Sequence, residues 1–133
     1  MLLEKDLQKL VYQLLQMDFA HIQLDGSDIR VGIFDKATKL SLSTCVYNGG
    51  NYIPKSVRKC VSQKAPFESK EIKVYLTVDE ANFQIFLNYL GNIEVLNYLL
   101  FQELLSEFTH LVDEWRLYLD KHDKDDLVYI PIK

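Results

Sequence analysis

The apolar residues of this chain switch repeatedly between two spacings, and this switching constrains the fold more than any other feature. From Leu3 to Leu15 they recur every three or four residues among charged and polar neighbours, which is typical of an amphipathic helix over residues 2–17. Over residues 20–47 apolar and polar residues alternate instead, with a turn at Asp25-Gly26, and this alternation predicts a three-stranded meander. The chain therefore begins with a helix that leads into antiparallel strands.

The second half of the chain repeats the same change of spacing. Pro54 is suited to the first position of a helix, and the apolar residues that follow it up to Val61 predict a short helix that ends before Pro66. Alternation returns in residues 72–78 and 83–90, with a turn between them. These two runs predict a second β-hairpin.

A long helix is predicted after this hairpin, because helical spacing resumes at about Glu94 and continues to Leu119. Its apolar side includes Phe108, Leu111 and Trp115, which we expect to anchor the helix in the core. The full order is helix, three strands, short helix, two strands and long helix. This order favours an α+β fold in which helices pack on a mainly antiparallel sheet.

The length of 133 residues suits one domain, and 48% hydrophobic residues are enough to form one core. We predict a single domain over residues 1–119 and a C-terminal tail over residues 120–133. The tail begins with the charged cluster DKHDKDD and ends with the apolar, strand-like peptide LVYIPIK.

Charge and cysteine content narrow the choice of partner and compartment. The net charge of -4 argues against direct binding of nucleic acid, which requires concentrated positive charge. The first residues carry charges where a signal peptide would be apolar, and no apolar run reaches the ~18 residues of a membrane span. We therefore expect a cytoplasmic protein in which Cys45 and Cys60 are reduced thiols.

Few residues suggest chemistry. His110 and Glu114 lie four residues apart beside Asp113, a spacing that suits either two metal ligands or a surface polar pair next to a buried stripe. One helix face offers no third ligand, and neither cysteine has a histidine near it in sequence. We therefore expect no metal, no cofactor and no enzymatic activity, although a small enzyme or metal protein remains an alternative.

One short segment is basic. Lysine and arginine side chains give the predicted short helix a positive edge, formed by Lys55, Arg58, Lys59 and Lys64. This edge is either a solvated face or a docking surface for an acidic partner.

The chain has more apolar residues than one core of this size needs. In the second hairpin Tyr75, Phe86 and Leu90 fall on the face opposite Ile85 and Leu87, so that the sheet is expected to be apolar on both faces. The start of the long helix is apolar around its whole circumference. A compact core absorbs this surplus in one interpretation, whereas dimerisation and binding of another polypeptide cover it in the other, which we favour.

The order of elements and the segment LLSEFTHLVDEWRL at residues 104–117 resemble the class I (Tir/Syc-like) type III secretion chaperones. In that family the last helix often has a similar pattern of Leu-Leu-x-x-Phe and a later Trp. The resemblance covers nearly the full chain and implies a dimeric carrier without catalysis. Such a carrier holds a segment of a secreted effector or gatekeeper protein in a non-globular, secretion-competent form, by strand addition and hydrophobic patches.

The resemblance also implies positions for two surfaces. The dimer interface maps to the short helix and the strand after it, at Val57, Val61, Ile72 and Val74. The client surface maps to exposed apolar positions near Leu3, Leu7 and Ile33. The partner is a second copy or a different small chaperone, as in SycN-like subunits, and the apolar tail slightly favours the heterodimer.

An alternative function within reach of the same features is regulation of transcription. Members of the family take such second roles by contacting RNA polymerase or a transcription factor through protein–protein contacts. The basic edge of the short helix and the acidic residues of the tail are suited to contacts of this kind.

Overall fold

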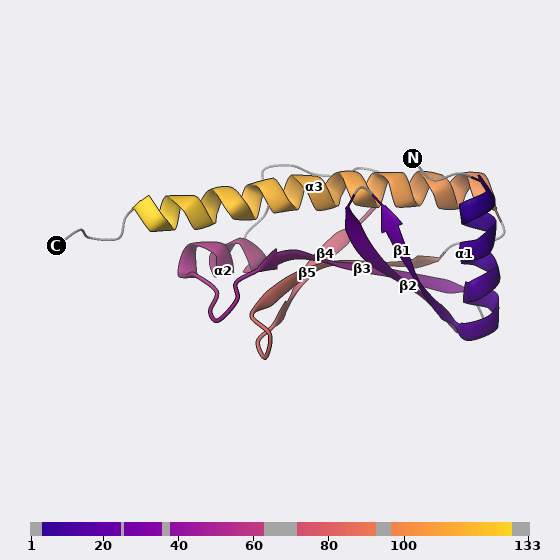
Figure 1. Cartoon of the computed structure of the whole chain (residues 1–133), viewed down its shortest axis with the longest axis horizontal. Coiled ribbons are helices and arrows are strands. Elements are labelled where there is room, and N and C mark those ends of the chain that lie inside the picture. Colours follow the sequence, from indigo (N-terminus) through magenta and orange to yellow (C-terminus); the bar gives the residue numbers. More distant parts are fainter. Residues whose placement is uncertain (1–3, 25, 36–37, 63–71, 93–96, 129–133) are drawn as a thin grey trace.

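The computed structural model describes residues 4–24, 26–35, 38–62, 72–92 and 97–128. It contains three helices and five strands within these residues, in the order helix, three strands, helix, two strands, helix (Figure 1). Their bounds are α1 Glu4–Met17, β1 Phe19–Leu24, β2 Ser27–Phe34, β3 Lys39–Asn48, α2 Lys55–Ser62, β4 Val74–Asp79, β5 Gln84–Asn92 and α3 Tyr98–Val128. The order of elements and the α+β class predicted from the sequence are confirmed.

The five strands form one antiparallel sheet in the order β1-β2-β3-β5-β4. Consecutive strands pair as hairpins, except that β3 pairs with β5 and leaves β4 at the edge. Gly26 has a φ of 80° in the turn between β1 and β2, a conformation that glycine adopts without steric cost. Strands β1 and β4 are therefore the two edges of the sheet.

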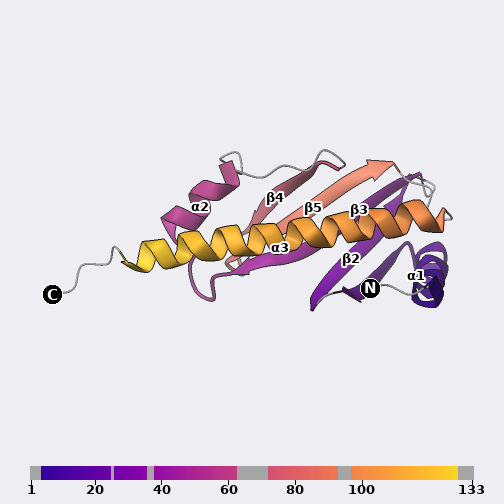
Figure 2. The ribbon, with the colours of Figure 1, turned by 90° about the horizontal axis from the view of Figure 1, so that it is seen from above.

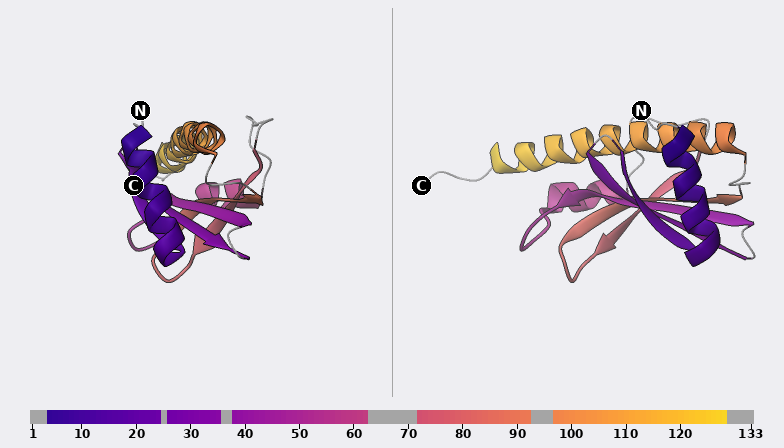
Figure 3. Two further views of the ribbon diagram at one scale, coloured as in Figure 1. Left: turned by 90° about the vertical axis from the view of Figure 1, so that its right-hand side faces the viewer. Right: turned by 45° about the vertical axis from the view of Figure 1, so that its right-hand side comes forward.

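The helices lie on one face of the sheet, which we call the core face. Helix α3 runs the length of this face, with β4 and β5 on one side of it and β2 and α1 on the other (Figures 1 and 2). Helix α1 lies across the start of α3 and beside β1, whereas α2 contacts the later part of α3 (Figure 3). The opposite side of the sheet, the outer face, has no described helix on it.

The alternating pattern of the sequence places the core. In β3 the side chains of Leu40, Leu42, Thr44 and Val46 are buried on the core face, while Ser41, Ser43 and Cys45 between them are less buried. The strand register extends this pattern to the neighbouring strands. Val31 of β2 and Tyr89 of β5 lie directly opposite Leu42, one on each side of β3. A single apolar core results, and it fills the space between the sheet and the three helices.

Helix α3 continues past the predicted end at Leu119, as far as Val128. The whole charged cluster assigned to the tail, residues 120–126, is therefore helical. No glycine or proline occurs from residue 98 to residue 130, so the backbone has no breaker until Pro131. The ion pair of Lys124 with Asp120, one turn apart at 3.1 Å, supports this end of the helix. The last five residues of the apolar peptide LVYIPIK lie outside the described residues.

None of the helices in the described part of the chain combines the length and apolar character needed to cross a bilayer.

Candidate functional site

Groups suited to catalysis or metal binding are scattered in the described residues. No cluster of three histidine, cysteine, aspartate or glutamate side chains occurs there that could hold a metal ion. His110 lies 3.5 Å from Glu114 on the exposed side of α3, as a surface pair one turn apart. Burial raises the pKa of the Cys45 and Cys60 thiols, which disfavours the reactive thiolate. We therefore turn to the exposed surfaces of the described residues.

The edge strand β4 forms one of these surfaces. Within the described residues β4 pairs only with β5, so the backbone N–H and C=O groups along its other side have no strand beside them. On its core face Val74, Leu76 and Val78 pack against the core but remain half-buried. On its outer face Tyr75 is half exposed. The edge thus combines apolar side chains with backbone groups that are available for pairing.

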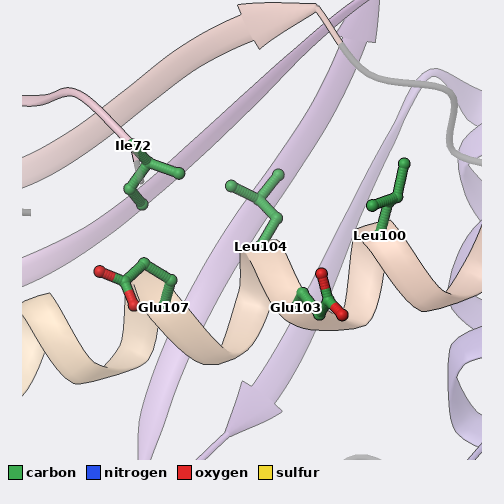
Figure 4. A pocket seen from close by; sticks show the side chains of 5 residues that line it. All are labelled: Ile72, Leu100, Glu103, Leu104 and Glu107. Atoms are coloured by element: carbon green, nitrogen blue, oxygen red, sulfur yellow. The ribbon is translucent and has the colours of Figure 1, made fainter. Parts of the chain in front are cut away.

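A groove lies between α3 and the segment that leads into β4. It has a volume of about 380 Å³ and is lined by Ile72, Leu100, Glu103, Leu104 and Glu107 (Figure 4). The spacing of its four α3 residues places them on one side of the helix, facing the segment that contains Ile72. Its lining is mixed, with two leucines and an isoleucine beside two glutamates. We call β4 and this groove together the β4 flank.

The residues predicted for a dimer interface divide between this flank and the core. Ile72 and Val74 lie at the β4 flank and are partly exposed. Val61 at the end of α2 is partly buried as well. Val57, in contrast, is 0% exposed and packs inside the core, so that its side chain is not available to a partner. The interface itself stays a prediction.

The residues predicted near the client surface are not exposed where they are described. Leu7 is 1% exposed and Ile33 is 7% exposed, because both point between α1 and the sheet, and the expectation that they are exposed is wrong. Leu3 lies outside the described residues. Their partners in the core explain the burial, since α1 and the sheet cover each other there. Client binding near these positions stays a prediction.

Five other large apolar side chains near Leu7 and Ile33 are exposed, and none of them was predicted for the client surface. These side chains lie at the end of α1 and on the first two strands, and they are Tyr12, Leu15, Met17, Phe19 and Phe34. Phe19 lies opposite Gly32, two residues from Phe34, so both phenylalanines occupy one corner of the outer face. Apolar residues that fall off the buried stripe of α1 were the available signal.

The outer face is apolar in its β4–β5 half only in part. Tyr75 and Leu90 are half exposed there and Phe86 is partly covered, as the sequence predicted. Asn88 lies between them, and its amide donates to the Thr77 hydroxyl at 2.9 Å. The start of α3 likewise exposes Leu99 and Leu100 and buries Phe101.

The predicted anchors of the last helix lie in the core. Phe108, Leu111 and Trp115 are all buried between α3 and the sheet. Trp115 also contacts Tyr118 edge to face, with 5.7 Å between ring centroids. These residues hold α3 on the sheet, and so they position one wall of the groove at the β4 flank.

The basic edge of α2 is partly engaged within the chain. Arg58 donates to both carboxylate oxygens of Glu80 in the β4–β5 turn, at 3.0 and 2.8 Å. Lys55 and Lys59 are exposed. Of the predicted basic residues, Lys64 lies outside the described part of the chain.

Comparison of the chain with models of known protein families and with curated proteins finds no match.

Proposed function

We propose that this protein is a chaperone of the class I type III secretion type, which binds a segment of a secreted effector or gatekeeper protein and keeps it non-globular. The observation that carries this proposal is the β4 flank, where a strand edge with no described strand beside it lies next to a groove that combines apolar side chains with two glutamates. An extended polypeptide adds to such an edge by backbone hydrogen bonds, and pockets beside the edge select its side chains.

The distribution of apolar surface supports a polypeptide ligand. Large apolar side chains are exposed in two regions of the outer face, one in β4 and β5 at Tyr75 and Leu90 and the other in β1 and β2 at Phe19 and Phe34. Monomeric proteins rarely expose large apolar patches unless another molecule covers them. A protein dimer on one region and a client on the other would use both.

The experiment is co-expression of the chain with a secreted protein encoded beside it, followed by purification and hydrogen exchange. We expect a stable complex in which the bound client segment lacks the slow exchange of a folded domain, except at residues paired with the chaperone. A client that folds as a domain within the complex would contradict the proposal, as would a monomeric chain with no affinity for that protein.

Two matched variants locate the interaction. Leu76→Lys places a charge on the core face of β4 and should weaken the association at this edge by about tenfold or more, because a lysine ammonium is costly to bury without a partner. Gln23→Lys adds the same charge to the exposed side of β1 and should leave the association unchanged. Equal effects of both variants would argue against the β4 flank as the interaction surface.

A further inference from the structure

A notch lies between β2 and β3, near the tip of the first hairpin. The two strands pair from Arg30 opposite Ser43 onward, whereas β2 already begins at Ser27. The tip of the β1–β2 hairpin rises from the sheet toward α3 (Figure 1). On the β3 side, the register with β5 shifts between Cys45 and Tyr47, which is a bulge. The diverging strands leave a gap at this end of β2.

Arg116 of α3 bridges this gap. Its Nη1 donates to the Ser27 hydroxyl at 2.7 Å, and its Nη2 donates to the Cys45 carbonyl at 2.9 Å. Both acceptors are neutral, and Arg116 forms no ion pair with any described residue. A partly buried guanidinium keeps its full charge, and the aspartates that share a cavity with Arg116 form no ion pair with it: Asp28 lies beside His21, Asp120 pairs with Lys124, and Asp123 accepts from Tyr47. The two hydrogen bonds fix the planar group in place.

Arg58 provides the contrast within the same chain. It is also partly exposed, but both oxygens of Glu80 accept hydrogen bonds from it, so its charge is compensated by a carboxylate. Two hydrogen bonds also fix the guanidinium of Arg116, but neither of its acceptors is a carboxylate. A carboxylate from another molecule would complete it.

A cavity of about 240 Å³ lies beside the Arg116 side chain. Its lining includes Arg30, Ser43, Gln84 and Phe86, which supply a second cation, two neutral hydrogen-bonding groups and an apolar wall. Asp28 also lines it, and its carboxylate lies 3.6 Å from His21 Nδ1. The cavity is smaller than the ~300 Å³ or more of pockets for drug-sized ligands, and this size suits one side chain or a chain end.

We propose that this notch binds a carboxylate of a polypeptide, either an Asp or Glu side chain or a free C-terminus, between Arg116 and Arg30. A phosphate group is less suited to it, because Asp28 would repel a dianion more strongly than a monoanion. The neighbouring Phe86 favours an apolar residue next to the acidic one. The proposal rests on the proposed function only in assigning the carboxylate to a polypeptide.

Nuclear magnetic resonance of the arginine side chains tests the proposal. The chain has three arginines, Arg30, Arg58 and Arg116, so their Nε–Hε signals are few and Arg58 serves as an internal reference. Sodium acetate should shift the Arg116 and Arg30 signals saturably and leave Arg58 unshifted. Acetamide, and sodium chloride at equal ionic strength, should produce no saturable shift. Inorganic phosphate should bind more weakly than acetate.

Variants and short peptides sharpen the result. Arg30→Gln should weaken acetate binding by about tenfold, as should Arg116→Lys, which keeps the charge but loses the planar fork. Arg30 is exposed on the outer face, so its variant tests the site even if Arg116→Lys destabilises the fold. Lys5→Gln, on the exposed side of α1, is the matched control and should not change binding.

The source of the carboxylate is distinguished by acetyl-Phe-Glu-amide, acetyl-Phe-Gln-amide and acetyl-Phe-Gly with a free C-terminus. Binding of the first or the third supports the site and names its source, whereas equal binding of acetyl-Phe-Gln-amide overturns it. Unsaturable acetate shifts, or tighter binding of phosphate than of acetate, would also overturn it. If acetate fails to bind while Leu76→Lys still weakens the complex with a client, the notch proposal alone is lost.

Discussion

The two edge strands of the sheet, β1 and β4, differ in how far helices cover them. Helix α1 lies beside β1, where Leu10 and Ile22 line the same pocket, and the core-face residue Ala20 is buried. No described helix covers β4 to the same extent, and none of its residues is fully buried. In addition, its core-face side chains are all apolar, namely Val74, Leu76 and Val78.

From this difference we infer that another molecule adds to the sheet at β4 and not at β1. Edge strands are commonly protected by charges, prolines or a covering element. Apart from Asp79 at its end, β4 carries no charge and no proline. The chain's own helix α1 therefore covers one face of β1, whereas we propose that the less covered β4 edge serves as an interface.

Truncation of one leucine on each side should give the largest difference between the edges. Leu10 on α1 is 4% exposed and Leu100 on α3 is 52% exposed. Leu10→Ala should lower the free energy of unfolding by about 2–5 kcal/mol because it leaves a cavity. Leu100→Ala should lower it by less than about 0.5 kcal/mol in the monomer. Chemical denaturation at low protein concentration measures both, and similar losses would contradict the comparison.

A charge at each edge should affect association next most strongly. Val74→Lys should raise the dissociation constant of the proposed complex with a client by about tenfold or more, because the lysine disfavours pairing at an apolar edge. His21→Lys on β1 is the matched control and should leave the constant unchanged, since His21 is already exposed and lies beside Asp28. Sedimentation velocity over a range of concentrations reads out both variants. If His21→Lys also abolished association, the interface would lie at β1 and the comparison would be contradicted.

The loss of stability at alkaline pH tests a contact that does not involve either edge strand. This contact joins Tyr47 of β3 to Asp123, in the part of α3 that is far from α1. Burial, together with the nearby Asp123 carboxylate, raises the pKa of Tyr47 from 10.0 to about 12. The tyrosine hydroxyl donates to Asp123 at 3.3 Å. Between about pH 10 and about pH 12 the unfolded chain loses this proton and the folded chain keeps it, so stability should fall as pH rises through this range.

Tyr47→Phe should flatten that alkaline loss of stability, and Asp123→Asn should reduce it, because the carboxylate contributes to the raised pKa. Denaturation at a series of alkaline pH values measures the slope. An unchanged slope in Tyr47→Phe would mean that another group governs the alkaline behaviour.

The smallest effect is expected at the ion pair that joins α2 to the β4–β5 turn. Glu80→Gln removes the carboxylate that Arg58 contacts, yet both side chains are largely solvated, so stability should fall by no more than about 1 kcal/mol. Asp35→Asn removes the comparable exposed pair with Lys39 at the β2–β3 turn and should behave alike. A loss of several kcal/mol from Glu80→Gln alone would show that the β4 side depends on this pair.

The predicted elements came from local pattern and were confirmed, whereas exposure of single residues was predicted less well. Leu7 and Ile33 carry the periodicity of buried faces, and they are buried. Their assignment to an exposed client surface came from the resemblance and not from that periodicity. The predicted end of α3 came too early in the sequence. The charged residues after Leu119 were predicted to form a solvated tail, although a helix can be solvated as well.

The sequence by itself determined the order of the helices and strands and the face that each turns to the core, because spacing of apolar residues is a local property of the chain. Only the tertiary structure decided that β4 is left at an edge, that Val57 lies inside, and that Ser27, Cys45 and Arg116 meet. Those outcomes depend on strand order and on contacts between residues far apart in the chain. The physical reason is that the burial of a side chain depends on which elements pack around it. The sequence of one element does not specify those neighbours.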